Sequence, residues 1–314
     1  MPTETTGLGH RRRLSSRVRS LARPAGRWTL LLASGALASC GGVLDPQGPI
    51  GESDKTLLVD SVAIMLAIIV PVILVILGFA WWYRASNLRA RYRPDFAYSG
   101  QLELIVWAIP LLTIILLGGV AWIGSHDLDP AKPLGPPDAA LEVEVVSLDW
   151  KWLFIYPEQH VASVNKLVIP AGVPIHFTLT SASVMNSFFI PRLGSMIYTM
   201  NGMATQLYLH ADRPGAYAGL SSHYSGDGFS DMHFEVEAMA KDGFDGWIAG
   251  TRGSGQTLDA GSYAELAKQS QKVAPMTYGG VAPDLFGKIV MQGLPPGPGP
   301  IDEVSPGASK RAEN

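Results

Sequence analysis

The sequence of 314 residues contains a single cysteine, Cys40. One thiol excludes an internal disulfide framework, a cysteine-rich zinc site and a two-cysteine redox motif. Charge is also scarce, at 16% of residues, whereas apolar residues make up 47% and the mean hydropathy is +0.18. Membrane segments are the usual cause of such a composition, and we therefore expect them in this chain.

The chain lacks an excess of basic residues as well. Its formal net charge is −3, and residues 127–314 carry 12 Lys and Arg against 20 Asp and Glu. Nucleic-acid binding needs a basic patch on the protein surface, so no nucleic-acid partner is expected. The acidic balance does not identify a partner, because a negative surface attracts any cationic molecule.

The N-terminus combines a basic stretch with an apolar run that is too short to cross a bilayer. Residues 1–39 hold seven Arg against one Glu, and the apolar run is Trp28–Ala38. The sequence Leu37-Ala-Ser-Cys40-Gly resembles a bacterial lipobox, in which the thiol is acylated before cleavage. We expect residues 1–39 to be a lipoprotein signal peptide and Cys40 to carry the lipid, a palmitate. An ordinary signal peptide with a chance cysteine is the alternative.

Two stretches contain no charged residue at all. Ser61–Tyr83 has 23 residues and Leu104–Gly124 has 21, and each matches the ~20 residues that cross the hydrocarbon layer as a helix. We predict transmembrane helices over residues 56–83 and 104–125.

The loop between these helices, residues 84–103, sets their orientation. It holds four Arg against a single Asp before Glu103, so the positive-inside rule places it in the cytoplasm. Residues 40–55 and the C-terminal part of the chain are then periplasmic, and the protein is a multi-pass protein of a bacterial inner membrane.

Beyond a proline-rich linker, residues 126–140, the pattern changes to short β-branched and aromatic runs separated by Gly and Pro. The expected strands are Leu141–Val146, Trp150–Tyr156, Val164–Ile169, Ile175–Thr180, Gln206–His210 and His233–Val236. Strands at this spacing over residues 141–250 predict an all-β Greek-key sandwich or barrel. For residues 251–314 we expect a tail with a short helix over Tyr263–Lys272 and a disordered end.

Two stretches carry a resemblance to a known family, namely Asp149-Trp-Lys-Trp-Leu-Phe-Ile-Tyr-Pro-Glu-Gln159 and Ser183-Val-Met-Asn-Ser-Phe-Phe-Ile-Pro-Arg-Leu-Gly-Ser195. Both resemble subunit II of the bo-type ubiquinol oxidases, in the haem-copper oxidase superfamily. The resemblance covers roughly Cys40 to Gly250 and implies a two-helix hairpin followed by a cupredoxin-like domain. Tyr278, Phe286 and their neighbours resemble the aromatic-rich C-terminal segment of some family members, for which we expect a surface strap.

A third stretch, Tyr217–Met232, falls where the cytochrome c oxidases of the superfamily keep a dinuclear copper motif, Cys-x-Glu-x-Cys-Gly-x-x-His-x-x-Met. Ser221 and Ser225 stand at its thiolate positions, His223 at its Glu, and Phe229 at its His; only Met232 is retained, and Asn186 replaces an upstream His. Serine hydroxyls are weak ligands for copper and phenylalanine has no donor atom. The resemblance therefore implies a degenerate copper site without metal, and a chain without catalytic residues or a bound cofactor. Trp150 and Trp152 are interpreted as packing residues.

The resemblance implies a non-catalytic structural and assembly subunit of a proton-pumping terminal ubiquinol oxidase. Because the periplasmic electron acceptor is missing, the donor is expected to be dissolved in the membrane rather than a soluble cytochrome, and the resemblance implies that it is ubiquinol. Haems and the remaining copper are expected in subunit I, the main partner, with subunits III and IV and membrane lipid as further partners.

Two alternatives belong to other classes. One is a copper-containing cytochrome c oxidase subunit II with an altered site, which stoichiometric copper would reveal. The other is a membrane-anchored binding module of cupredoxin fold unrelated to respiration, which would purify without a haem-bearing partner.

Overall fold

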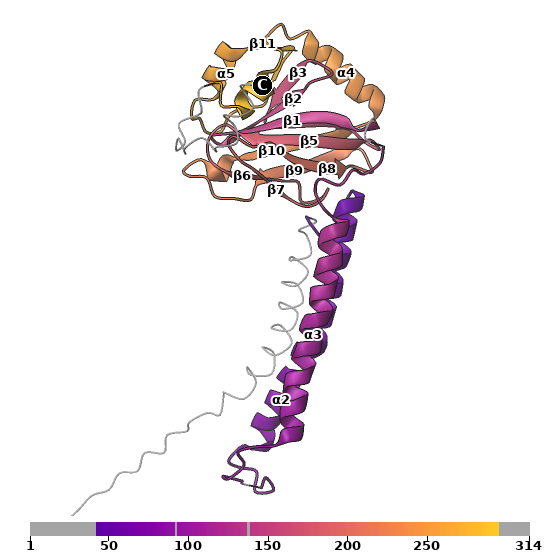
Figure 1. Ribbon diagram of the computed structural model, residues 1–314, viewed down its shortest axis with the longest axis vertical. Coiled ribbons are helices and arrows are strands. Elements are labelled where there is room, and N and C mark those ends of the chain that lie inside the picture. The colour runs from indigo at the N-terminus through magenta and orange to yellow at the C-terminus, as the bar shows by residue number, and fades with distance from the viewer. Residues whose placement is uncertain (1–41, 92, 137–138, 295–314) are drawn as a thin grey trace, which may run out of the picture.

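The computed structural model describes residues 42–91, 93–136 and 139–294, and Figure 1 shows two long helices projecting from one end of a β-rich domain. This arrangement confirms the predicted order of an apolar helical hairpin followed by an all-β domain. The expected signal peptide, the expected acylation site Cys40 and residues 295–314 lie outside the described residues.

The two helices are α2, Pro49–Trp82, and α3, Gly100–Asp127, and both are long and apolar enough to cross a membrane. α2 begins before the expected residue 56. Pro49 favours this start because the fixed φ of proline suits the first helical turn and its missing N–H has no partner there in any case. Apolar side chains are exposed along both helices, which is typical of helices that face lipid or a membrane partner.

The β domain contains two large sheets with a hydrophobic core between them. The first sheet has the strand order β12-β3-β2-β1-β5-β8, and the second has the order β4-β10-β9-β6-β7. β1 runs parallel to β5 and β4 runs parallel to β10, whereas the other neighbours are antiparallel. The strands are β1 Leu141–Leu148, β2 Lys151–Tyr156, β3 Val161–Val164, β4 Lys166–Pro170, β5 Pro174–Ser181, β6 Asn186–Phe189, β7 Ile197–Thr199, β8 Thr205–His210, β9 Gly215–Ser221, β10 His233–Met239 and β12 Met276–Tyr278.

The first sheet is apolar on both faces. In β1, Val143 and Val145 pack into the core between the two sheets, whereas Val146 and Leu148 pack on the opposite side. Successive side chains of a strand point to opposite faces, so a strand with apolar residues on both faces needs cover on both sides.

The run Val164–Ile169, expected as one strand, belongs to two strands in different sheets. Asn165 separates β3 from β4 with a φ of 54°, a left-handed conformation that asparagine tolerates better than most residues. Its side chain accepts a hydrogen bond from the N–H of Trp152 at 2.9 Å and donates one to the carbonyl oxygen of Val273 at 2.8 Å. The chain therefore passes from the first sheet to the second at this residue.

Residues 251–294 contribute the edge strand β12 to the first sheet and otherwise form a layer that covers its outer face, where we expected a tail after Gly250. Helix α4, Lys241–Arg252, crosses that expected boundary, and the expected helix Tyr263–Lys272 is the shorter α5, Ala260–Leu266. The remaining elements are β11 Thr257–Leu258, β13 Gly280–Val281 and α6 Leu285–Val290. Tyr263 and Phe286 belong to the same buried cluster as Leu148 and Ile155 of the first sheet. This layer provides the cover that the apolar outer face requires.

Candidate functional site

The six positions of the copper motif meet at one end of the second sheet. Asn186 begins β6 and Ser221 ends β9, the adjacent antiparallel strand. The loop after β9 carries two more of them, and the short 3-10 helix η3, Phe229–Asp231, carries another directly before Met232. We name these residues the degenerate copper site: Asn186, Ser221, His223, Ser225, Phe229 and Met232.

The two innermost side chains of this site form a hydrogen bond with each other. Asn186 and Ser221 are both buried, and the Ser221 hydroxyl lies 3.3 Å from Oδ1 of Asn186 and 3.2 Å from the carbonyl oxygen of His223. The amide nitrogen Nδ2 of Asn186 donates to the carbonyl oxygen of Val184 at 3.2 Å. The polar atoms that replace two copper ligands are therefore engaged with protein groups.

The outer positions are filled by packing contacts. The Ser225 hydroxyl lies 3.8 Å from the sulfur of Met232, which is buried. The Phe229 ring packs against Tyr224 with centroids 5.5 Å apart, and the His223 ring contacts Tyr198 edge-on at 5.8 Å. Met232 is buried while the next residue, His233, is exposed, so these two side chains do not converge on one point.

This set of donor atoms does not fit a dinuclear copper centre. It offers two hydroxyls, one amide, one thioether and a single half-exposed imidazole, whereas bridging thiolates are what a copper pair requires. Across the described ranges 42–91, 93–136 and 139–294, no cluster of three or more His, Cys, Asp or Glu side chains is placed to hold a metal ion.

Trp150 holds the loop of the degenerate copper site in place. Its backbone is left-handed, with a φ of 62°, and its indole N–H donates to the carbonyl oxygen of Ser225 at 3.0 Å. The ring lies directly on Gly228, where an added Cβ would come within 2.3 Å of it. Trp152, by contrast, is buried in the core against Phe188, with ring centroids 5.4 Å apart.

The two stretches that carry the family resemblance meet at Asp149. The Ser183 hydroxyl donates to the carboxylate of Asp149, and Lys151, two residues further on, is almost fully buried. The Lys151 ammonium group donates to the carbonyl oxygen of Lys268 and to the hydroxyl of Ser270, both at 2.7 Å. Burial lowers the pKa of Lys151 to about 8, against an opposing effect of Asp149. Lys151 therefore joins β2 to the C-terminal layer.

The second stretch also holds the beginning of α2. The carbonyl oxygen of Arg192 accepts from the N–H of Gln47 at 2.7 Å, and that of Leu193 accepts from the N–H of Gly51 at 3.1 Å. The Arg192 guanidinium group forms an ion pair with Asp45 and lies over the Tyr217 ring, 5.6 Å from its centroid. These contacts fasten the membrane hairpin to the β domain.

Lys151 and Arg192 lie within the two stretches that carry the family resemblance, and the sequence alone indicated no role for either of them. Their partners, Lys268 and Asp45, lie far away in the sequence, so no local pattern could have revealed the contacts. The only available signal was a charged residue inside an otherwise apolar run.

Two known families match the chain. The periplasmic domain of cytochrome c oxidase subunit II matches residues 142–239, and the aromatic-rich motif of these oxidases matches residues 252–297, where we expected such a segment.

Known relatives match most of the chain. Subunit 2 of the cytochrome bo(3) ubiquinol oxidase of Pseudomonas aeruginosa is 44% identical over 84% of this chain and 80% of its own length. Ubiquinol oxidase subunit 2 of Acetobacter aceti is 48% identical over 86% of this chain and 87% of its own length. Among solved structures, the periplasmic domain of cytochrome oxidase subunit II of Bradyrhizobium japonicum is 22% identical, with a TM-score of 0.34 over 36% of this chain and 94% of that one.

Proposed function

The chain belongs to the family of ubiquinol oxidase subunit 2, and from that premise we propose that it anchors and helps to assemble its oxidase without binding copper. As a member of this family it is a subunit of a respiratory oxidoreductase complex. The observation that carries the proposal is the donor set of the degenerate copper site, in which Ser221 and Ser225 replace both thiolates.

The residues of the degenerate copper site indicate the route by which electrons enter the oxidase. A soluble cytochrome would need an acceptor in the periplasmic domain, and the hydrogen-bonded pair of Asn186 and Ser221 leaves no ligand for one. In our proposal ubiquinol therefore delivers its electrons directly to the large subunit I, which holds the haems and the remaining copper and couples oxygen reduction to proton pumping. No side chain of this chain takes part in the chemistry.

The helical hairpin crosses the inner membrane in this proposal. The apolar surfaces of α2 and α3 support this role, since they are exposed and so are available to lipid and to other oxidase subunits. The β domain then lies in the periplasm, and the arginine-rich loop between the helices lies in the cytoplasm. We retain Cys40 as the acylation site.

The end of the β domain that carries the degenerate copper site is the proposed contact with subunit I. It exposes large apolar and aromatic side chains, namely Met185, Met196, Tyr198, Met203 and Tyr224. Methionine and aromatic residues are enriched at protein interfaces. Figure 1 shows β6 and β7 on the side of the domain from which the hairpin projects, so a membrane-embedded partner beside the hairpin can reach this surface.

The test is purification of the whole complex through this chain in mild detergent. We expect a haem spectrum from the partner, oxidation of ubiquinol, and no oxidation of reduced cytochrome c. Cytochrome c oxidation, or the purple absorbance of a dinuclear copper centre, would overturn the proposal. Isolation of the chain without any haem-bearing partner would instead favour a binding module outside respiration.

A further inference from the structure

A cavity of about 720 Å³ lies at the end of the hairpin farthest from the β domain. It is formed where α2 ends and α3 begins, together with the loop between them. Its lining residues are Phe79, Trp82, Tyr83, Arg89, Arg91, Arg93, Phe96 and Leu102. The volume is in the range of cavities that hold small ligands.

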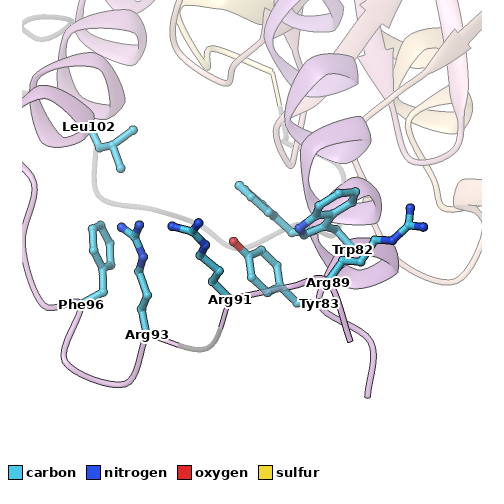
Figure 2. A pocket seen from close by; sticks show the side chains of 8 residues that line it. Trp82, Tyr83, Arg89, Arg91, Arg93, Phe96 and Leu102 are labelled. Atoms are coloured by element: carbon cyan, nitrogen blue, oxygen red, sulfur yellow. The ribbon is translucent and has the colours of Figure 1, made fainter. Parts of the chain in front are cut away.

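The polar part of the cavity is basic. Three arginines line it and no carboxylate does, and Figure 2 shows Arg91 and Arg93 pointing into the space between the two helix ends. No ion pair between residues that the structure describes involves either of them. Neighbouring guanidinium groups repel each other unless an anion lies between them, so the arrangement favours an anionic ligand.

Arg84 of the same loop provides a contrast. Its guanidinium group donates to the carbonyl oxygen of Trp81 at 2.9 Å and to the Ser86 hydroxyl at 3.0 Å, and it lies over the Trp81 ring. The positive-inside rule accounts for basic residues anywhere in this loop. It does not account for Arg91 and Arg93 being directed into one cavity.

The apolar part of the cavity indicates where the ligand lies. Trp82 and Tyr83 end α2, and Phe96 and Leu102 face them from the other side (Figure 2). Aromatic rings at the ends of membrane helices occupy the headgroup layer. From Phe79 the exposed apolar surface of α2 continues along the helix, which gives an acyl chain a surface to follow.

We propose that this cavity binds the headgroup of an anionic phospholipid of the cytoplasmic leaflet. The proposal rests on the membrane crossing and orientation given under the proposed function. Arg91 and Arg93 donate to the phosphate oxygens, because a planar guanidinium group matches a phosphate with two parallel hydrogen bonds. The Tyr83 hydroxyl is placed on the wall of the same cavity, and the acyl chains lie against Phe79.

The competing occupant is an acidic segment of a partner subunit. The lipid is favoured because the charged groups and the lipid-facing rings belong to one cavity at headgroup depth, so one molecule with an anionic head and apolar tails satisfies both. An acidic peptide would satisfy only the arginines.

The test uses the whole oxidase complex in lipid nanodiscs of phosphatidylcholine with a minor fraction of phosphatidylglycerol. Phosphatidylglycerol retained after a detergent wash is counted by native mass spectrometry. Removing one arginine that donates to the bound phosphate should reduce retention about fivefold, so Arg91→Gln with Arg93→Gln should reduce it ~25-fold. The matched control, Arg84→Gln, removes a charge from the same loop outside the cavity and should change retention less than twofold. Arg91→Lys with Arg93→Lys keeps the charge that orients the loop and should give an intermediate loss.

The following outcomes would overturn the proposed lipid site. Equal retention in the wild type and in the Gln and Lys variants would do so, as would displacement of phosphatidylglycerol by inorganic phosphate alone. Loss of partner subunits with unchanged lipid would assign the cavity to an acidic segment instead. Labelling of the loop in intact cells separates the two proposals: a loop labelled from the periplasmic side contradicts the proposed orientation, whereas a cytoplasmic loop with unchanged lipid contradicts only the site.

Discussion

Lys151 is a charged side chain in an almost fully buried position, 1% exposed. It is tolerated because its ammonium group has acceptors within reach, the carbonyl oxygen of Lys268 and the hydroxyl of Ser270. Burial still disfavours the charge and lowers the pKa of Lys151 from its ordinary 10.5 to about 8. The folded chain therefore releases this proton more readily than the unfolded chain.

This difference predicts a pH dependence of stability. Between about pH 8 and 10.5 the unfolded chain binds more protons than the folded chain, so the contribution of Lys151 to the free energy of unfolding rises with pH in this window. Below pH 8 the lysine is protonated in both states and contributes no slope. Lys151→Met should remove the rise, as measured by thermal unfolding midpoints of the purified chain in detergent. Lys241→Met, at an exposed position, should leave the rise in place. The same slope in Lys151→Met and in the wild type would contradict this prediction.

At the residue scale, Gly228 is also sensitive to substitution, because it lies under the Trp150 ring. Gly228→Ala places a methyl group within 2.3 Å of the ring and should destabilise the β domain by about 1–3 kcal/mol, the usual cost of overpacking. Chemical denaturation followed by tryptophan fluorescence measures the loss. The control is Gly246→Ala in α4, where nothing lies within 4 Å of the added Cβ and a gain of up to about 1 kcal/mol is expected. A Gly228→Ala protein as stable as the control would show that the loop moves freely away from Trp150.

At the scale of elements, the start of α2 and the β6–β7 connection act as one unit. The N–H groups of Gln47 and Gly51 bind carbonyl oxygens of Arg192 and Leu193, and the Arg192 side chain reaches back to Asp45. At Gly48 an added Cβ would lie 2.1 Å from the carbonyl oxygen of His210, so the backbones meet too closely for any other residue. A rigid connection of this kind fixes the β domain against the membrane hairpin.

Arg192→Ala should loosen this connection without unfolding either part. The loss of the ion pair and of the Tyr217 contact should cost about 1–2 kcal/mol, which corresponds to 5–30-fold faster amide exchange at Gln47 and Gly51. Hydrogen–deuterium exchange of the purified chain measures this change. Lys166→Ala removes an ion pair with Glu237 elsewhere in the domain and should leave exchange at these two amides unchanged. Protected amides in Arg192→Ala would mean that the backbone contacts hold the connection alone.

At the scale of the whole molecule, residues 141–294 form one folding unit on a membrane anchor. The buried cluster on the outer face of the first sheet, which includes Tyr263 and Phe286, couples the C-terminal layer to that sheet. A deletion that ended at residue 250 would leave this layer without the sheet that it covers, so the unit has to be removed as a whole.

Deletion of residues 141–294 tests the assembly role. With the proposed contact surface removed, we expect less haem per large subunit and a lower yield of the complex, both measured by optical spectra of membranes. Ser225→Ala, which changes one hydroxyl of the degenerate copper site, should leave the haem content and ubiquinol oxidation at the wild-type level. A deletion complex with a normal spectrum and normal activity would count against the assembly role.

A feature of the fold can be predicted from the sequence when its physical cause lies within one continuous segment. The hairpin and most strands of the β domain were predictable, because the lack of charge and the alternation of apolar residues are properties of continuous segments. Five strands of the two large sheets were not expected over most of their residues, namely β3, β6, β7, β9 and β12, although β6 lies inside a stretch that carries the resemblance. These strands are short or contain glycine and polar residues, so they have little periodicity, and pairing with neighbouring strands is what makes them extended.

The sequence by itself determined the two helices long enough to cross a membrane and the loss of the copper ligands at Ser221, Ser225 and Phe229, because a side chain without a suitable donor atom cannot bind copper in any fold. Only the tertiary structure decided that Asn165 divides one apolar run between two sheets and that residues 251–294 cover the first sheet. It alone also placed Arg91 and Arg93 in one cavity with Tyr83. These features depend on contacts between segments that are distant in sequence or folded back on each other, and no pattern within a single segment records such contacts.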